Sequence, residues 1–135
     1  MNRAINAAAI AFCVAGTGCD IDVTAVDMVG AWGGEHILLT VSLTGSTVEY
    51  DCAHGAIDGP IVLDRDGTFT LRGIHVREHG GPVREDEVPD EHPARYWGWT
   101  DGSRMRLTVT LMDTGETMGP YELRLGRTPQ LFKCL

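Results

Sequence analysis

The side chains best suited to metal binding are five histidines, in a chain that also holds 19 acidic residues. His75 and His79 are four residues apart, a spacing that would align them on one face of a helix. On a strand the same spacing separates them by about 13 Å, too far for one ion. A site would need His36, His54 or His92 to approach from neighbouring strands. We therefore predict no metal ligand set and no cofactor.

Acid/base catalysis is a second possible chemistry, because Asp51, His54, Glu78 and His79 could donate and accept protons. No segment resembles the Gly-x-Ser-x-Gly elbow that presents a serine nucleophile. A structural alternative is that Asp51 and His54 cap a tight turn. We predict no catalytic residue, and a metal-dependent or acid/base envelope enzyme remains the alternative to a binding protein.

The aromatic residues are candidates for a surface that binds a ligand or another protein, and not for catalysis. Trp97 and Trp99 alternate with Tyr96 and therefore share one face of a strand. If Tyr96 faces the core, both tryptophans lie outside and form a contact surface; if they face inward, they belong to the core. The candidate binding surface consists of Trp32, His36, His54, His75, Arg77, His79, Trp97 and Trp99.

These residues lie on segments in which apolar and polar side chains alternate between Gly, Asp and Thr turns, a pattern typical of antiparallel strands. The expected strands are 36–43, 47–52, 61–63, 68–77, 94–100, 104–112, one around 121–125, and 131–135. Seven or eight strands without an amphipathic helix predict an all-β fold, a small antiparallel up-and-down barrel of about eight strands or a small sandwich. Residues 79–93, rich in Gly, Pro and acids, are expected to form an exposed loop.

The long strand at 68–77 changes its phase in the middle. Phe69 shares one parity with Leu71, whereas Ile74 shares the other with Val76. Gly73 lies between them and predicts a β-bulge that returns the apolar residues to one face. This places His75 and Arg77 on the opposite face.

A short motif precedes the first expected strand. Gly30-Ala31-Trp32 resembles the Gly-x-Trp signature of lipocalin-like barrels. The resemblance implies a calycin or lipocalin-like barrel in which Trp32 closes one end beneath an arginine, either Arg124 or Arg127.

There are two further likenesses, of which the first runs over most of the mature chain and the second covers three residues. Segments 32–37, 49–55 and 77–84, with the ending Leu-Phe-Lys-Cys-Leu, look like a group of uncharacterised exported bacterial proteins, and this likeness implies no activity. Tyr50-Asp51-Cys52 is similar to the Tyr-x-Cys strand of small lysozyme-inhibitor barrels. That similarity implies inhibition of an envelope enzyme as a further alternative.

The first 18 residues have the layout of a secretory signal peptide, with one positive charge, no acid and a small or apolar run over 7–16. The run is too short to cross a bilayer. Gly16-Thr17-Gly18-Cys19 resembles a lipobox, which implies lipidation of Cys19 and a membrane anchor. Cleavage after Gly16 or Gly18 would instead release a secreted or periplasmic protein. We expect a signal peptide at 1–18, a tether at 19–28 and a barrel domain at 29–135.

The remaining cysteines support export. With Cys13 in the signal peptide and Cys19 carrying lipid, Cys52 and Cys134 form an even pair, which we expect to be a disulfide in an oxidising compartment. Closing a loop of about eighty residues contributes roughly 4 kcal/mol in the chain-entropy treatment.

The formal net charge of −8 repels phosphate backbones, so nucleic acid is not an expected partner. The sequence therefore favours a non-enzymatic binding or interaction module of the cell envelope, held to the membrane by a lipid anchor. Its expected partner is an unknown protein or small apolar ligand, recognised through one barrel end and the 79–93 loop.

Overall fold

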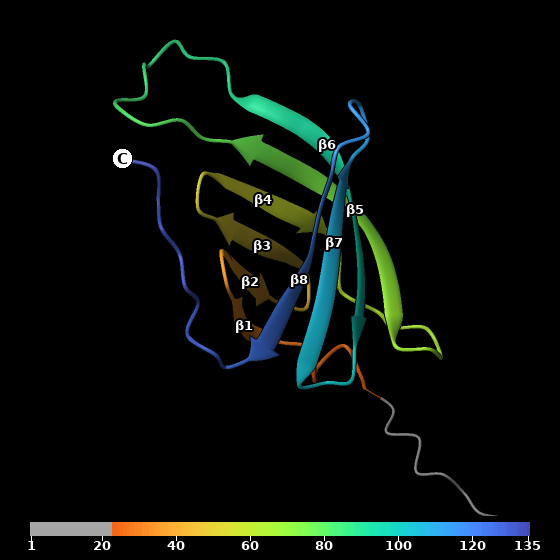
Figure 1. The fold of residues 1–135 in the computed structure, drawn as a ribbon. Helices are drawn as coiled ribbons and strands as arrows, with labels where there is room; N and C mark the ends of the chain where they lie inside the picture. The colour runs from red at the N-terminus through yellow and green to blue at the C-terminus, as the bar shows by residue number, and fades with distance from the viewer. Residues whose placement is uncertain (1–22) are drawn as a thin grey trace, which may run out of the picture.

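Residues 23–135 are described by a computed structural model and form a closed antiparallel barrel (Figure 1). Each strand pairs with the next, and β8 pairs back with β1. The predicted all-β, up-and-down barrel of about eight strands is confirmed. None of the described residues belongs to a helix long and apolar enough to cross a membrane. The strands are β1 (Gly30–Gly34), β2 (Ile37–Val41), β3 (Gly45–Tyr50), β4 (Ala53–Asp58), β5 (Thr68–Arg77), β6 (Asp90–Thr100), β7 (Arg104–Leu111) and β8 (Thr117–Leu125).

Large side chains fill the interior of the barrel. Alternate residues of each strand point inward, as the two-residue period of a strand requires. Burial of each aliphatic side chain stabilises the fold by about 1.5–3 kcal/mol. The largest fully buried side chains are Trp32, Tyr96, Met28, Ile37, Leu39, Ile61, Met105, Leu107, Leu111 and Leu123.

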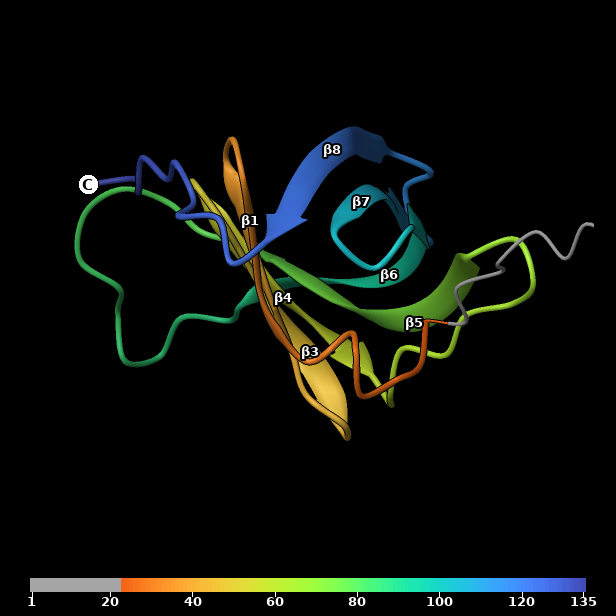
Figure 2. The same cartoon turned by 90° about the horizontal axis from the view of Figure 1, so that it is seen from below.

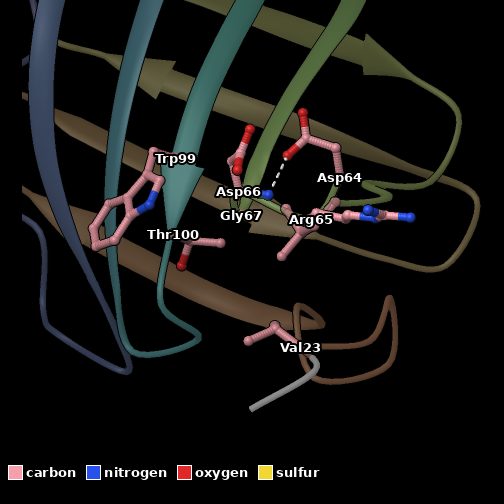
Figure 3. Close-up of a pocket in the computed structure, with 8 residues that line it drawn as sticks. Val23, Asp64, Arg65, Asp66, Gly67, Trp99 and Thr100 are labelled. Atoms are coloured by element: carbon pink, nitrogen blue, oxygen red, sulfur yellow. Dashed lines mark hydrogen bonds between the residues drawn. The ribbon is translucent and has the colours of Figure 1, made fainter. Parts of the chain in front are cut away.

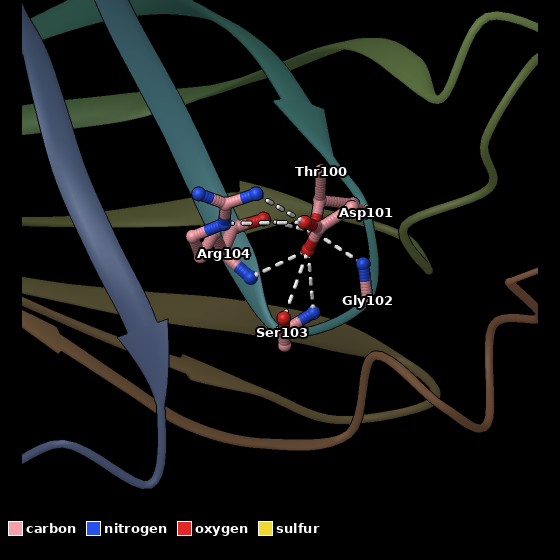
Figure 4. A network of polar contacts seen from close by, with 5 residues as sticks. All are labelled: Thr100, Asp101, Gly102, Ser103 and Arg104. Atoms are coloured by element: carbon pink, nitrogen blue, oxygen red, sulfur yellow. Dashed lines mark hydrogen bonds and ion pairs between the residues drawn. The ribbon is translucent and has the colours of Figure 1, made fainter.

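The β6–β7 hairpin follows its sequence pattern closely. The predicted inward row, Met105, Leu107, Val109 and Leu111, is fully buried. In the turn, the Asp101 carboxylate accepts hydrogen bonds from the backbone N–H groups of Arg104 at 2.8 Å and Ser103 at 2.9 Å (Figure 4). The bonds from the Arg104 and Ser103 backbone hold the pKa of this carboxyl well below its usual range.

Several local expectations are wrong. The expected strands did not include β1, whose glycine-rich sequence Gly-Ala-Trp-Gly-Gly shows little alternation, and β6 begins at Asp90, inside the segment 79–93 that was expected to be an exposed loop. Residues 53–58 form β4, which the sequence did not indicate, because its inward positions are Ala53, Gly55 and Ile57 and two of these are small. Segment 61–63 is not a strand. The expected strand at 131–135 is instead part of an extended segment, residues 127–135, which we call the strap.

The predicted bulge at Gly73 is also absent from the described pairing. β5 pairs with β6 residue by residue from Thr68 opposite Trp99 to Arg77 opposite Asp90. Because the ladder is unbroken, Gly73 keeps the inward parity of Phe69, and a Cβ there would lie 1.9 Å from the Ala56 carbonyl oxygen. His75 therefore faces inward and is 3% exposed, contrary to the expected outward position.

The up-and-down order gives the barrel two distinct ends. Connections β1–β2, β3–β4, β5–β6 and β7–β8 lie at one end, which we call the histidine end. Figures 1 and 2 show the long β5–β6 loop and the C-terminus projecting there. At the opposite end, which we call the N-terminal end, Val23 lies against Gly102 of the β6–β7 turn.

The described part of the expected tether packs on the barrel. Met28 is fully buried, Val23 is partly buried against the core, and Thr24 and Asp27 close a turn through their side chains. The Trp32 indole N–H donates to the Met28 carbonyl at 2.9 Å. Folded structure thus begins before residue 29, whereas the predicted signal peptide and Cys19 lie outside the described residues.

Candidate functional site

All five histidines gather at the histidine end. His36 lies in the β1–β2 turn, His54 in β4, His75 near the end of β5, His79 just after β5, and His92 near the start of β6. The up-and-down topology brings these positions together, because alternate turns share one end of such a barrel.

Four of the histidines are engaged with separate carboxylates. The pairs are His36 with Asp51 at 2.6 Å, His54 with Glu78 at 2.9 Å, His79 with Glu87, and His92 with Asp113 at 2.7 Å and Asp90 at 2.9 Å. Within residues 23–135, no group of three His, Cys, Asp or Glu side chains is placed to hold a metal ion. The convergence of histidines that a metal enzyme would need is not seen.

The hydrogen bonds of two of these histidines raise the pKa of their imidazoles. The hydrogen bond to Asp113 raises the pKa of His92 above its usual value, with a smaller contribution from Asp90. The Gly80 carbonyl and then Glu87 raise the pKa of His79. Both imidazoles are therefore more readily protonated than free histidine.

His75 is the exception among the five. Its ring is almost wholly buried, and its Nδ1 has no hydrogen-bond partner among the described residues. Burial, together with the nearby Arg77 charge, lowers the pKa of His75. The imidazole is therefore neutral at pH 7, with one nitrogen able to donate a hydrogen bond and the other able to accept one.

Tyr50 contacts His75 and, like it, is a buried residue with an unpartnered polar atom. The two rings meet edge to face with centroids 5.0 Å apart. Tyr50 is 5% exposed, and its hydroxyl also lacks a partner within the described part of the chain. The Tyr96 hydroxyl lies close to that of Tyr50, but it donates its proton to the Ile74 carbonyl at 2.6 Å and the geometry leaves Tyr50 without a partner. Burial raises the pKa of Tyr50, so its side chain is a neutral phenol.

Tyr50 and His75 are among the residues that line a hollow of about 410 Å³ at the histidine end, which we call the mouth, although their two unpartnered atoms are closed off from solvent. Such a lining, mostly apolar with a few polar atoms, is typical of sites for small molecules. It offers apolar contact from rings and sulfur, and hydrogen bonds from a phenol and an imidazole. The mouth is lined by His36, Tyr50, Asp51, Cys52, Ala53, His75, Arg77, Glu78, Met118 and Tyr121.

The strap is attached beside the mouth. The expected disulfide is confirmed: Cys52 is bonded to Cys134, with their Cα atoms 5.2 Å apart. Asp51 accepts the Phe132 backbone N–H at 2.8 Å, and this bond, with a smaller contribution from His36, lowers the pKa of its carboxyl. The Lys133 ammonium donates to the Tyr50 carbonyl at 2.7 Å. Asp51 thus acts in a turn that fixes the strap.

Arg77 and Trp32, two further members of the candidate surface, differ in their exposure to solvent. Arg77 lines the mouth and pairs with Glu116. Trp32 is fully buried and therefore contributes to the core, not to a surface. Arg124 and Arg127 are exposed, and the indole of Trp32 uses the Met28 carbonyl as its partner.

Trp97 and Trp99 lie on the outer wall of the barrel. Tyr96 between them is fully buried, which decides between the two orientations left open by the sequence. Trp97 is 44% exposed, and both indoles border a hollow of about 450 Å³ with Arg104, Arg106 and Glu122. The candidate surface therefore consists of two separate sites, the mouth and this wall.

A third hollow, of about 380 Å³, lies at the N-terminal end (Figure 3). Val23, Trp99 and the loop 63–67 line it. The Asp64 carboxylate accepts the backbone N–H groups of Asp66 and Thr68, both at 3.0 Å. Its acidic group is thus used to hold the loop, and the mouth remains the better ligand site.

No protein-family model, curated protein or solved structure matches the chain. The candidate site therefore rests on geometry. Sequence reasoning missed Tyr50, Met118 and Tyr121 as lining residues. These residues could have been predicted from the expected topology, because in an up-and-down barrel the residues that flank every second turn lie at the same end.

Proposed function

We propose that this protein is a non-enzymatic binding module of the cell envelope, and that the mouth takes a small, partly apolar ligand. The observation that supports it most is the pair of buried polar atoms, Tyr50 Oη and His75 Nδ1, that lack partners among residues 23–135. A buried polar group left without a hydrogen bond costs about 1–3 kcal/mol. Both atoms are closed off from solvent, so a ligand has to displace the side chains that cover them. A ligand that then bonds to both recovers this free energy, which makes them suitable recognition groups.

The lining defines the ligand chemistry. Tyr121 and Met118 offer apolar contact, while neutral Tyr50 and His75 offer one donor and one acceptor each. A compact ring that carries a hydroxyl, amide or carbonyl group meets both requirements. Because large core side chains fill the barrel behind the mouth, the ligand is bound at the barrel end and not carried inside.

The proposed compartment follows from the cysteines. A disulfide between Cys52 and Cys134 suits an oxidising environment such as the periplasm or cell surface. We propose Cys19 as the lipid anchor that holds the module to a membrane. Replacing it with Ser should move the protein from the membrane fraction to the soluble fraction, and unchanged fractionation would contradict anchoring.

A fragment screen by protein-observed NMR tests the binding proposal. We expect compact cyclic alcohols and amides to shift the resonances of Tyr50, His75 and Tyr121 together. Tyr50→Phe should weaken binding by roughly tenfold, the value of one hydrogen bond of about 1.4 kcal/mol. Tyr96→Phe is the matched control, since it removes a hydroxyl that does not line the mouth. Shifts that fall elsewhere, or equal affinity of both variants, would reject the mouth as the site.

A further inference from the structure

The outer face of β5–β8 concentrates positive charge on a protein whose net charge is −8. Side chains point outward there because their strand neighbours, such as Tyr96 and Met105, are buried. We call this face the arginine wall. It consists of Arg72, Arg95, Trp97, Trp99, Arg104 and Arg124, together with the ion pair between Arg106 and Glu122, which lies among them.

The wall contains two pairs of like charges placed directly across from each other. Arg72 is opposite Arg95 in the β5–β6 ladder, and Arg104 is opposite Arg124 in the β7–β8 ladder. Like charges in directly opposite positions destabilise a sheet. Asp101 partly compensates Arg104, but within residues 23–135 no ion pair involves Arg72, Arg95 or Arg124. A bound anion would relieve this repulsion.

The two tryptophans lie between the two arginine pairs. Trp97 is opposite Thr70 and Trp99 is opposite Thr68, so the row along β6 runs from arginine to two indoles. Indole rings with an apolar body and a polar N–H concentrate at the boundary between water and lipid. Guanidinium groups bind phosphate oxygens in a bidentate manner. Together they fit a surface of phosphate headgroups.

The wall lies beside the point where the described chain begins. Val23 and Trp99 line the same hollow (Figure 3). Exposed apolar side chains also lie at the N-terminal end: Val26 is 67% exposed, Leu43 55% and Val62 65%. Four residues can span at most about 14 Å, so a lipid on Cys19 would hold this end close to the bilayer.

We propose that the arginine wall binds an anionic phospholipid surface. The position of the anchor in this proposal rests on the proposed function, whereas the charge and tryptophan argument does not. Arginine side chains near a membrane surface are attracted to anionic headgroups, so the wall adds an electrostatic contact to the proposed lipid anchor. With the N-terminal end against the bilayer, the mouth opens on the opposite side.

Vesicle co-sedimentation tests the proposal. The probe is the full chain carrying Cys19→Ser, with vesicles of phosphatidylcholine alone or with one lipid in three replaced by phosphatidylglycerol. Contacts that do not depend on lipid charge occur with both kinds of vesicle. The measured quantity is therefore the difference in binding between the anionic and the neutral vesicles. We expect roughly tenfold stronger binding to the anionic vesicles, and loss of this preference as salt is raised.

Two double variants locate the contact. Arg72→Gln with Arg95→Gln should reduce the preference for anionic vesicles by several-fold, because two of the wall's arginines are removed, and Trp97→Leu should weaken it. Arg84→Gln with Arg127→Gln changes the total charge equally at exposed positions outside the wall and should leave the preference intact. All variants should still bind ligand at the mouth. A failure of the membrane proposal in the vesicle assay can therefore be distinguished from a failure of the proposed ligand binding.

Three results would overturn the proposal. They are equal binding to both vesicle types, an unchanged preference in the wall variant, and binding of an acidic polysaccharide or single-stranded nucleic acid by the wall without any preference for anionic vesicles.

Discussion

Replacement of Tyr50 by Phe is expected to stabilise the protein. The Tyr50 hydroxyl is buried and makes no hydrogen bond with the described residues, so folding removes it from water without compensation. An unsatisfied buried group of this kind costs about 1–3 kcal/mol. Phenylalanine keeps the ring and its contacts with His75 and Tyr121. We therefore expect the free energy of unfolding to rise by about 1 kcal/mol or more.

Tyr96→Phe is the matched comparison, with the opposite sign. The Tyr96 hydroxyl donates to the Ile74 carbonyl at 2.6 Å, so its removal loses a hydrogen bond and leaves a carbonyl unsatisfied. The expected loss is about 1–2 kcal/mol. The two substitutions delete the same atom from neighbouring phenols, and only the partner differs.

Urea unfolding at pH 7, followed by tryptophan fluorescence, measures both variants. For a domain of this size a change of 1 kcal/mol shifts the midpoint by several tenths of a molar unit. A loss of stability in Tyr50→Phe similar to that in Tyr96→Phe would refute the reasoning, because it would mean that the two phenols bond to each other. A gain in stability accompanied by loss of ligand binding is the signature of a group kept for function.

The remaining predictions concern the disulfide, the ion pairs of His92 and the packing around Gly55 inside the barrel. Replacing both Cys52 and Cys134 with Ser should lower the free energy of unfolding by about 4 kcal/mol, because the bond closes a loop with a sequence separation of 82; a loss below about 1 kcal/mol in urea unfolding would contradict this. The folded pKa of His92 is raised above 6.5, so its stabilisation is complete below pH 6.5 and disappears as pH rises through the folded pKa. The stability advantage of wild type over His92→Asn should shrink as the pH rises from about 6 through the raised pKa, and an advantage that grows with pH would contradict the expected sign. Gly55→Ala should destabilise by about 1–3 kcal/mol, since its Cβ would lie 2.3 Å from the Tyr96 hydroxyl oxygen and 2.6 Å from the Ile74 carbonyl; an unchanged melting temperature would show that the barrel accommodates the methyl group.

The strands with large inward residues were predictable from alternation. The β6–β7 hairpin has a long apolar row on β7 and a turn stabilised by Asp101, so its pattern and its structure agree. β4 was missed because its inward residue Gly55 makes room for the phenol group of Tyr96 on β6, two strands away. Such complementarity between distant strands leaves no periodic signal in either one.

The site was predictable only in part for the same reason. The histidines were recognised as candidates, but the bulge assigned to Gly73 turned His75 to the wrong face. Gly73 is needed where the β4 backbone approaches, which is a contact between strands and not a local break in the ladder. The unpartnered state of Tyr50 depends on which groups surround it in space, and no sequence pattern records that.

A crystal structure of the protein with a fragment identified by the screen tests the central claim most directly. We predict a fragment in the mouth, with a polar atom about 2.7–3.2 Å from Tyr50 Oη or His75 Nδ1. A mouth that remains empty while the fragment binds elsewhere, or a Tyr50 hydroxyl bonded within the barrel, would contradict the assignment of this barrel end as the ligand site.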